Sequence, residues 1–323
     1  MRFSPAYFED EVRDGFYVPS IMKRAWAAQL EILEDIDKVC QMYDIQYFAD
    51  MGTLLGAVRH GGFIPWDDDV DICMKRKDYD KFISVAEKEL PECYYLLNCH
   101  NEYNGEIYWD FMTRVVNQHQ ISFEEAHLTK FHGFPYVSGV DIFSLDFMAP
   151  TEEQEAERIG RISLASDLIE AIDDGIADNE LEEQLYQVEQ MCSVRIDRKK
   201  NIKQQLYILI ERFFALYNEH EAEVIAMLPL GFEKPRHRFP KKYYEEVIKL
   251  PFENTEIPVP AAYEAILKKK YGNYLKIARK GGAHEYPFYK RQEEVLEKEK
   301  GIKFLHYKVP ETSLDGKCGE NGK

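Results

Sequence analysis

One segment, "GTLLGAVRHGGFIPWDDDVDICM" from Gly52 to Met74, constrains this chain more than any other. Four aspartates fall within residues 67–71 of this segment, and apolar residues lie on both sides of them. Carboxylates that are held close together and partly removed from water repel one another, unless a cation lies between them. The sequence therefore predicts a cation site at this segment.

The residues "DVDICM" alternate acidic and apolar side chains, which is typical of a half-buried strand. Successive side chains of a strand point to opposite faces, so we expect Asp67, Asp69 and Asp71 on one face and Val70 and Ile72 in the core. A donor set of carboxylate oxygens suits Mg²⁺ or Mn²⁺, which proteins hold through a few carboxylates together with substrate phosphates. The missing ligands would then be phosphate oxygens.

Two other interpretations of the acidic run are weaker. Acidic runs are often solvated loops, but here the run lies among apolar residues. A calcium loop requires glycine at its sixth position and usually glutamate at its twelfth, where this chain has Ile72 and Asp78. A Mg²⁺ or Mn²⁺ site is therefore the preferred interpretation.

Two further segments complete the predicted site. Gly52 is expected to form a turn before a helix that begins at Thr53, whose free backbone N–H groups and hydroxyl would bind a phosphate. Near the end of this helix, Arg59 is expected to contact phosphate or to cap the helix, and capping is the preferred role for His60. Asp141 lies in the apolar run "SGVDIFSLD" and therefore needs a partner. If this run lies beside "DVDICM", Asp141 would bind the same metal or accept a proton from a substrate hydroxyl.

Charge and hydropathy exclude several classes of function. The formal net charge of −17 argues against a nucleic-acid partner, because binding to phosphate backbones needs a basic face. The chain contains neither a signal-peptide pattern nor an apolar run long enough to span a bilayer. We therefore expect a cytoplasmic protein without a transmembrane segment, and leave peripheral contact with the inner membrane surface open.

The six cysteines are scattered and form no C-x-x-C pair, which fits isolated thiols in a reducing compartment. A sharper interpretation is a zinc site formed by Cys93, Cys99 and His100, joined by His119 or His127. Structural zinc sites usually show tighter paired spacing, so isolated thiols are preferred and the zinc question stays open.

The chain-wide pattern predicts a mixed α+β fold, with a core sheet flanked by helices in residues 1–150. Apolar residues at helical spacing predict a helix from Ser20, its expected N-cap, to Tyr43. Residues 151–230 read as a helical insertion that opens with a capping box at Thr151 and Gln154. Residues 231–310 are expected to be a mixed segment packing on the core, and 311–323 a disordered tail.

Two surface features have alternative interpretations. The helix expected at residues 200–217 has an apolar stripe that suits a membrane surface, but packing against the domain is preferred. The basic residues of 268–280 favour either an anionic ligand or the negative end of a helix dipole. Trp66 is expected to fill the core.

The segment "GTLLGAVRHGGFIPWDDDVDI" resembles the signature of the LicD-like family, which includes bacterial phosphocholine transferases and, more distantly, fukutin and fukutin-related protein. The segments "SGVDIFSLD" and "FENTEIPVP" followed by "YEAILKKKYGNYLK" are similar to later parts of the family pattern, except that Ser144 stands where members often carry proline. The resemblance implies a nucleotidyltransferase-type fold. It also implies roles for six residues: a phosphate element at Gly52 and Thr53, paired metal carboxylates at Asp69 and Asp71, a third acid at Asp141, and an additional acidic position at Asp67.

The activity implied by this resemblance is metal-dependent transfer of a phospho-alcohol group, such as phosphocholine, from a CDP-activated donor to a glycan or glycolipid hydroxyl, with release of CMP. One alternative is transfer of a nucleotide from an NTP to a small molecule or protein. Another is a non-catalytic module that binds a glycan or nucleotide. The sequence does not identify the alcohol that is transferred, the glycan that accepts it, or the oligomeric state.

Overall fold

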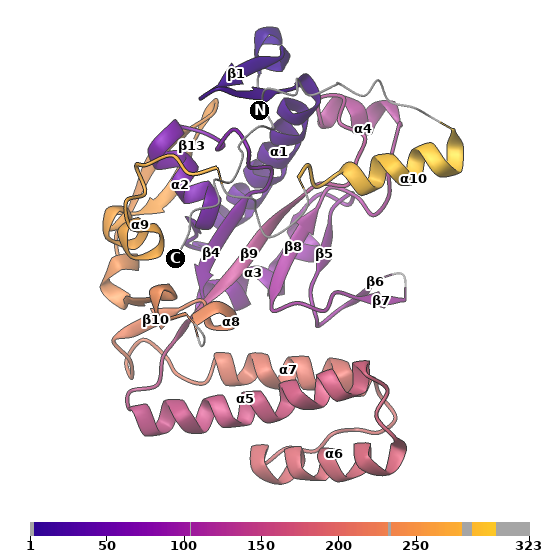
Figure 1. Cartoon of the computed structure of the whole chain (residues 1–323), viewed down its shortest axis with the longest axis vertical. Coiled ribbons are helices and arrows are strands. Elements are labelled where there is room, and N and C mark those ends of the chain that lie inside the picture. Colours follow the sequence, from indigo (N-terminus) through magenta and orange to yellow (C-terminus); the bar gives the residue numbers. More distant parts are fainter. Residues whose placement is uncertain (1–2, 104, 232–233, 280–285, 302–323) are drawn as a thin grey trace, which may run out of the picture.

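A mixed sheet of seven strands forms the centre of the molecule, in a computed structural model that describes residues 3–103, 105–231, 234–279 and 286–301 (Figure 1). Its strands are β3 (Phe48–Ala49), β4 (Asp71–Lys75), β5 (Tyr95–Leu97), β8 (Met112–Val116), β9 (Gly139–Phe147), β10 (Val224–Ala226) and β11 (Arg238–Pro240). The strand order is β11-β10-β9-β4-β3, while β8 pairs with β9 and β5 pairs with β8. Strands β4 and β9 are parallel, and the other neighbours are antiparallel. This confirms the predicted α+β class. The tail expected at 311–323 lies outside the described residues.

Helices α1 (Ser20–Met42), α2 (Met51–His60) and α3 (Arg76–Glu89) pack on this sheet. Helix α1 buries Trp26, Leu30, Leu33 and Ile36, as the apolar spacing predicts. The predicted N-cap is wrong, because Pro19 holds that position and Ser20 is the first helical residue. Apolar side chains of α1 and of the two parallel strands form one continuous core.

Two element boundaries near the aspartates differ from the prediction. Helix α2 begins at Met51 because the Asp50 side chain caps it by accepting a hydrogen bond from the Met51 backbone N–H. Gly52 therefore lies inside the helix, which ends at His60 with Gly61 as its C-cap. Strand β4 begins only at Asp71, since β3 is two residues long and pairs with positions 72 and 73 of β4. Residues 67–70 thus form a loop before the sheet.

Helices α5 (Glu152–Asp173), α6 (Asp178–Cys192) and α7 (Ile202–Phe214) lie together at one end of the molecule and have their own apolar core (Figure 1). The predicted N-cap is confirmed, since the Thr151 hydroxyl accepts a hydrogen bond from the Gln154 backbone N–H. Helix α7 buries Leu206 and Ile210 in this core, which confirms packing within the protein as a use of its apolar stripe. Strand β10 lies within 151–230 but pairs with β9 of the core sheet, which the sequence did not predict.

The C-terminal part packs beside the core sheet. A hairpin of β12 (Val247–Phe252) and β13 (Thr255–Pro260) leads into α9 (Tyr263–Tyr271), whose C-cap is Gly272, and α10 (Lys290–Lys300) follows. The shorter elements are η1 (Pro5–Phe8), β1 (Glu11–Arg13), β2 (Phe16–Val18), β6 (Glu102–Tyr103), β7 (Glu106–Ile107), α4 (Glu125–Lys130), α8 (Leu228–Gly231), η2 (Pro235–His237) and η3 (Lys241–Tyr244).

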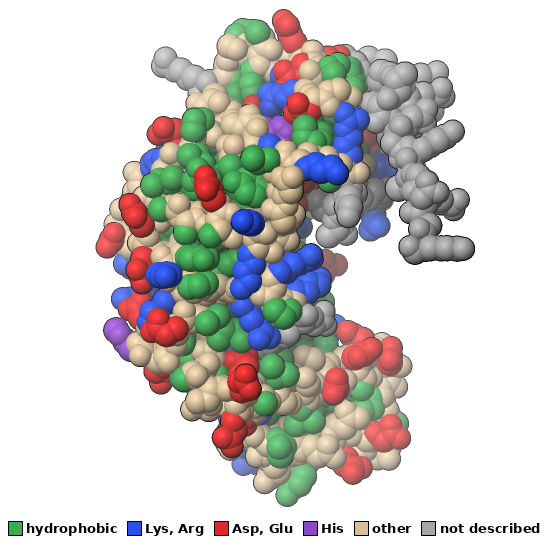
Figure 2. Space-filling model, turned by 60° about the vertical axis from the view of Figure 1, so that its left-hand side comes forward, with side chains coloured by type: hydrophobic (Ala, Val, Ile, Leu, Met, Phe, Trp, Pro, Cys, Tyr) green, Lys and Arg blue, Asp and Glu red, His purple; other side chains and the backbone are tan. Residues whose placement is uncertain are grey.

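Surface charge is unevenly distributed. Figure 2 shows Lys and Arg side chains gathering near the middle of one face, while Asp and Glu side chains lie over the end that carries α5 to α7. In the basic stretch noted in the sequence, Lys268, Lys269, Lys276 and Arg279 are exposed. Lys270 is instead buried and forms an ion pair with Asp50. In the described part of the chain, no helix combines the length and apolar character needed to cross a bilayer.

Candidate active site

Asp71 and Asp141 lie side by side on the two parallel strands at the centre of the sheet. Their Cα atoms are register partners of β4 and β9, and both side chains are buried, with 9% and 7% of their surface exposed. Burial raises the pKa of Asp71 well above its usual value, and the nearby charges of Asp69, Asp141 and Asp67 raise it further. The predicted meeting of these acidic residues across two neighbouring strands is therefore confirmed.

The loop before β4 brings three more carboxylates together. One carboxylate oxygen from each of Asp67, Asp68 and Asp69 lies within 4.8 Å of the others. Helix α1 fastens this loop, because the Trp26 indole N–H donates to the Asp67 carbonyl (3.0 Å) and the Gln29 amide donates to the Asp68 carbonyl (2.6 Å). The expected alternation along a strand is thus wrong for residues 67–70, and anchoring of the loop by α1 places their carboxylates instead.

Asp68 is the member of the acidic run that the sequence did not single out. Its side chain is 1% exposed, and its Oδ2 accepts a hydrogen bond from the Phe288 backbone N–H at 2.6 Å. Asp68 thereby ties the loop to the segment that precedes α10. Nothing in a run of three aspartates distinguishes the middle one as buried.

Gly52 and Thr53 hold the aspartates in place. A Cβ atom on Gly52 would lie 2.1 Å from Oδ2 of Asp67, so only glycine permits this carboxylate to approach the N-terminal turn of α2. A negative charge is favourable there because of the helix dipole. The Thr53 hydroxyl accepts a hydrogen bond from the Asp71 backbone N–H (2.8 Å), which fixes the start of β4. Phosphate binding by Gly52 and Thr53 stays a prediction.

Arg114 of β8 is a site residue that the sequence reasoning missed. It pairs with Asp141 through two hydrogen bonds, from Nε to Oδ1 and from Nη2 to Oδ2 (2.6 Å). Burial opposes the charge of Arg114, but the hydrogen bond and charge of Asp141 outweigh it and raise the arginine pKa. The sequence does contain a signal for Arg114. It is a charged residue within the apolar run "MTRVV", just as Asp141 is a charged residue within an apolar strand.

Arg59, His60 and Trp66 lie at the other end of α2. The Arg59 guanidinium donates to the carbonyl of Tyr274 (3.1 Å), and His60 faces Asp14 at 3.2 Å. Trp66 packs against the core, as predicted. The described contacts of Arg59 are with backbone and with His60, and contact with a phosphate stays a prediction.

A cavity of about 680 Å³ opens beside the aspartates. Asp69 and Asp141 contribute carboxylates to its wall, and Arg114 contributes a positive charge. The side chain of Gln292 binds the backbone of Val137 through two hydrogen bonds and so holds α10 over this cavity. The full lining is Gln29, Asp68, Asp69, Leu97, Arg114, Val116, Val137, Ser138, Gly139, Asp141, Pro287, Phe288, Arg291 and Gln292.

The zinc ligands considered in the sequence analysis do not all lie together in the structure. Within the ranges that the structure describes, Cys93 belongs to no group of metal-ligating side chains and instead lies near Lys130. His119 packs against a tyrosine ring, and His127 contacts Gln118 and a backbone carbonyl. Cys99 and His100 do lie together, but their neighbour is Glu211 of α7.

Comparison with known proteins agrees with this geometry. Residues 44–138 match the family described as LicD/FKTN/FKRP, nucleotidyltransferase domain. The chain carries a LicD-family domain. The matched region contains α2, the aspartate loop, the start of β4 and Arg114, and it ends just before the strand of Asp141.

Two relatives extend the comparison beyond the matched domain. The chain is 27% identical over 261 residues to the lipopolysaccharide cholinephosphotransferase LicD of Haemophilus influenzae (strain ATCC 51907 / DSM 11121 / KW20 / Rd), covering 77% of this chain and 89% of that protein. It is 30% identical over 103 residues to an uncharacterized protein of Rickettsia prowazekii (strain Madrid E), covering 26% of this chain and 38% of that protein. The first similarity extends well beyond the LicD-family domain.

Proposed function

We propose that this protein transfers a phospho-alcohol group, phosphocholine in the first instance, from a CDP-activated donor to a hydroxyl of a cell-surface glycan and releases CMP. The observation that carries the proposal is the meeting of Asp69, Asp71 and Asp141 beside one cavity whose wall also holds Arg114. The similarity to a protein named lipopolysaccharide cholinephosphotransferase supports phosphocholine as the group and lipopolysaccharide as the class of acceptor. Cytoplasmic location and contact with the inner membrane surface stay predictions.

The acidic residues fit a divalent cation. The donors are carboxylate oxygens, the ligands that Mg²⁺ and Mn²⁺ prefer, and one oxygen each of Asp67, Asp68 and Asp69 lies within 4.8 Å of the others. Burial and the negative charges of its acidic neighbours raise the pKa of Asp71, and a cation bound beside it would offset that charge. Asp67, Asp69, Asp71 and Asp141 would hold the cation, which when bound would neutralise charge on the diphosphate and on the departing CMP.

The residues of this chain have distinct roles in the proposed transfer. The acceptor hydroxyl oxygen forms a bond to the phosphorus that carries the alcohol, and the anhydride bond to CMP breaks. The hydroxyl proton leaves to a carboxylate, and we assign this role to Asp69 or Asp141, two of the three acids that line the cavity. Arg114 fixes the orientation of Asp141 and provides positive charge where the diphosphate would lie.

The test is incubation of the protein with Mg²⁺ and a panel of CDP-choline, CDP-ethanolamine and a CDP-alditol, with and without lipopolysaccharide. The proposal expects release of CMP that depends on the acceptor, together with a glycan carrying the phospho-alcohol. CTP serves as the control, because transfer of the nucleotide itself would release pyrophosphate and label the acceptor with CMP. Absence of acceptor-dependent CMP release from every donor would reject the proposal.

Removal of divalent cations is expected to stop the reaction. Treatment with EDTA should abolish CMP release, and added Mg²⁺ or Mn²⁺ should restore it, because the aspartates alone would repel the diphosphate. The measurement is the initial rate of CMP release before and after dialysis against the chelator. A rate that survives thorough chelation would contradict the metal assignment.

Replacement of Arg114 tests the cavity wall. The change Arg114→Met should lower kcat/KM about a hundredfold, since it removes two charge-assisted hydrogen bonds and the positive charge near the diphosphate. Arg114→Lys should keep only part of the activity, because lysine cannot form the paired contact. Arg161→Met removes an arginine paired with Glu157 on α5 and should leave the rate unchanged. Equal rates for all three variants and the wild type would exclude this role.

A further inference from the structure

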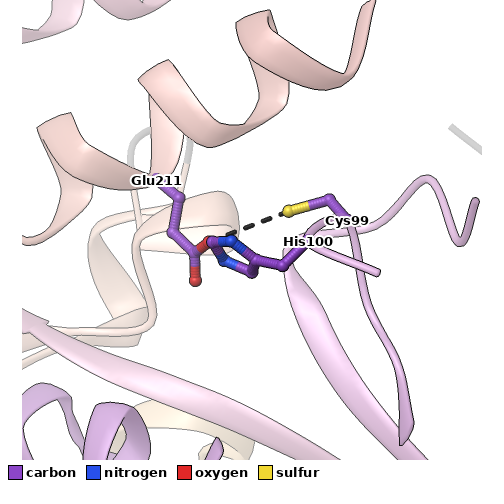
Figure 3. Close-up of side chains that lie close together, drawn as sticks. All are labelled: Cys99, His100 and Glu211. Atoms are coloured by element: carbon purple, nitrogen blue, oxygen red, sulfur yellow. Dashed lines mark hydrogen bonds and ion pairs between the residues drawn. The ribbon is translucent and has the colours of Figure 1, made fainter. Parts of the chain in front are cut away.

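A second group of metal-ligating side chains lies outside the aspartate site. Cys99 and His100 follow β5 of the core sheet, and Glu211 comes from α7 of the helical block (Figure 3). The Glu211 side chain is 10% exposed and Cys99 is buried, whereas the His100 side chain is 38% exposed. The three side chains thus join two parts of the fold at a point that solvent reaches.

The distances within this group suit a tetrahedral metal ion. The three ligand atoms lie within 4.8 Å of one another, and Cys99 Sγ is 3.7 Å from Glu211 Oε2. Zinc bonds of ~2.3 Å to sulfur and ~2.0 Å to oxygen at a tetrahedral angle place those two atoms ~3.5 Å apart. His100 Nε2 forms a hydrogen bond with the same Glu211 oxygen, so these two atoms would separate to admit an ion, and all three donors border one place (Figure 3).

Hydrogen bonds hold the loop that carries two of the donors. The Asn98 side-chain oxygen accepts from the backbone N–H groups of His100 (3.0 Å) and Asn101 (3.2 Å). The Gln204 amide of α7 donates to the backbone carbonyls of Cys99 and His100, both at 3.1 Å. Such outer contacts orient metal ligands before the ion arrives, and they are a regular feature of metal sites.

The electrostatic surroundings leave Glu211 able to take a cation. Arg76 contacts the other oxygen, Oε1, at 3.0 Å, so Oε2 is the atom directed at the cysteine and histidine. Asp146 neutralises the charge of Arg76 through two hydrogen bonds of 2.6 and 3.0 Å. The arginine therefore acts as an orienting partner for Glu211 and does not cancel its attraction for a metal ion.

We propose that Cys99, His100 and Glu211 form a zinc site that fastens the helical block to the core sheet. Sulfur, nitrogen and oxygen donors together suit Zn²⁺, whereas Mg²⁺ and Mn²⁺ prefer oxygen alone. When the zinc–sulfur bond forms, the thiol proton leaves to solvent, and a water molecule at the exposed side of His100 completes four ligands. This site shares no residue with the aspartate cluster.

The test uses the full-length protein, stripped of metal and then titrated with Zn²⁺ and, separately, with Co²⁺. Wild-type protein kept in excess Mg²⁺, which would occupy the aspartate site, should bind zinc in equal amount to protein and unfold at a higher temperature when zinc is present. With Co²⁺ it should show the near-ultraviolet absorption of a thiolate–cobalt bond. Cys99→Ser should lose that absorption and weaken zinc binding about a hundredfold, while the matched control Cys93→Ser should retain both.

A second variant distinguishes loss of zinc binding from loss of folding. The change His100→Gln affects a partly exposed side chain and leaves the contact of Glu211 with Arg76 in place, so it should fold normally by circular dichroism and still lose zinc. Wild-type protein that binds no zinc, or equal zinc binding by the Cys99 and Cys93 variants, would overturn the proposal. CMP release assayed in the same samples with Mg²⁺ reports on the aspartate site independently, so failure of one assignment is distinguishable from failure of the other.

Discussion

Exchange of Asp71 for asparagine is expected to lower the rate of CMP release about a thousandfold, equivalent to ~4 kcal/mol of transition-state stabilisation. Asparagine keeps the size of the side chain and the backbone N–H that binds the Thr53 hydroxyl, so the start of β4 should not move. What is lost is one negative charge at the centre of the acidic cluster. The measurement is the initial rate with CDP-choline, lipopolysaccharide and saturating Mg²⁺.

The same variant should be at least as stable as the wild type. Burial and the charges of Asp69 and Asp141 both oppose ionisation of Asp71, so removal of its charge relieves repulsion in the metal-free protein. Thermal unfolding in the presence of EDTA checks this. Asp173→Asn, on the exposed surface of α5, is the matched control and should leave the rate unchanged. Wild-type turnover in Asp71→Asn would refute the catalytic role of the acidic cluster.

The second large effect is expected at the buried pair of Lys270 and Asp50. Their side chains are 3% and 2% exposed, and Asp50 also caps α2 by accepting from the Met51 backbone N–H at 2.7 Å. The change Lys270→Met should lower the free energy of unfolding by about 3–5 kcal/mol, because it leaves a buried carboxylate without its cation. Chemical denaturation in guanidinium chloride measures this loss.

Two controls separate the buried charge from lost packing. The double variant Asp50→Asn, Lys270→Met should recover part of the lost stability. Asparagine can still cap α2, and because it is uncharged, no buried charge is left without a partner. Lys268→Met, an exposed lysine of the same helix, should change stability little. If the single and double variants lose equal stability, the ion pair is not the cause.

The parts of the fold that follow from local pattern could be predicted from the sequence. The spacing of Trp26, Leu30 and Ile36 indicated helix α1, and the Thr151 cap marked the start of α5. A charge within an apolar strand pointed to Asp141, and the pairing of β4 with β9 places it beside Asp71. Applied to β8, the same signal would have found Arg114.

Other features depend on contacts between distant segments, which a local pattern does not contain. Asp68 is buried because the Phe288 backbone N–H binds it from 220 residues away. Glu211 lies 112 residues from Cys99, and no local pattern links the two residues. Gly52 was taken as a turn residue, but it is required by the approach of Asp67, which comes from a loop anchored to α1. The basic stretch that contains Lys270 was assigned to an anionic ligand or a helix dipole, whereas the partner of Lys270 is Asp50, 220 residues away.

The central claim is that the aspartates before and on β4, with Asp141 on β9, hold a divalent cation beside the diphosphate of the donor. The most direct measurement is a crystal structure with Mn²⁺ and CDP-choline, in which anomalous scattering locates the metal. The account predicts an anomalous peak at coordination distance from Asp69 and Asp71, with the diphosphate in the adjoining cavity. A diphosphate bound elsewhere, or no peak at these carboxylates, would contradict it.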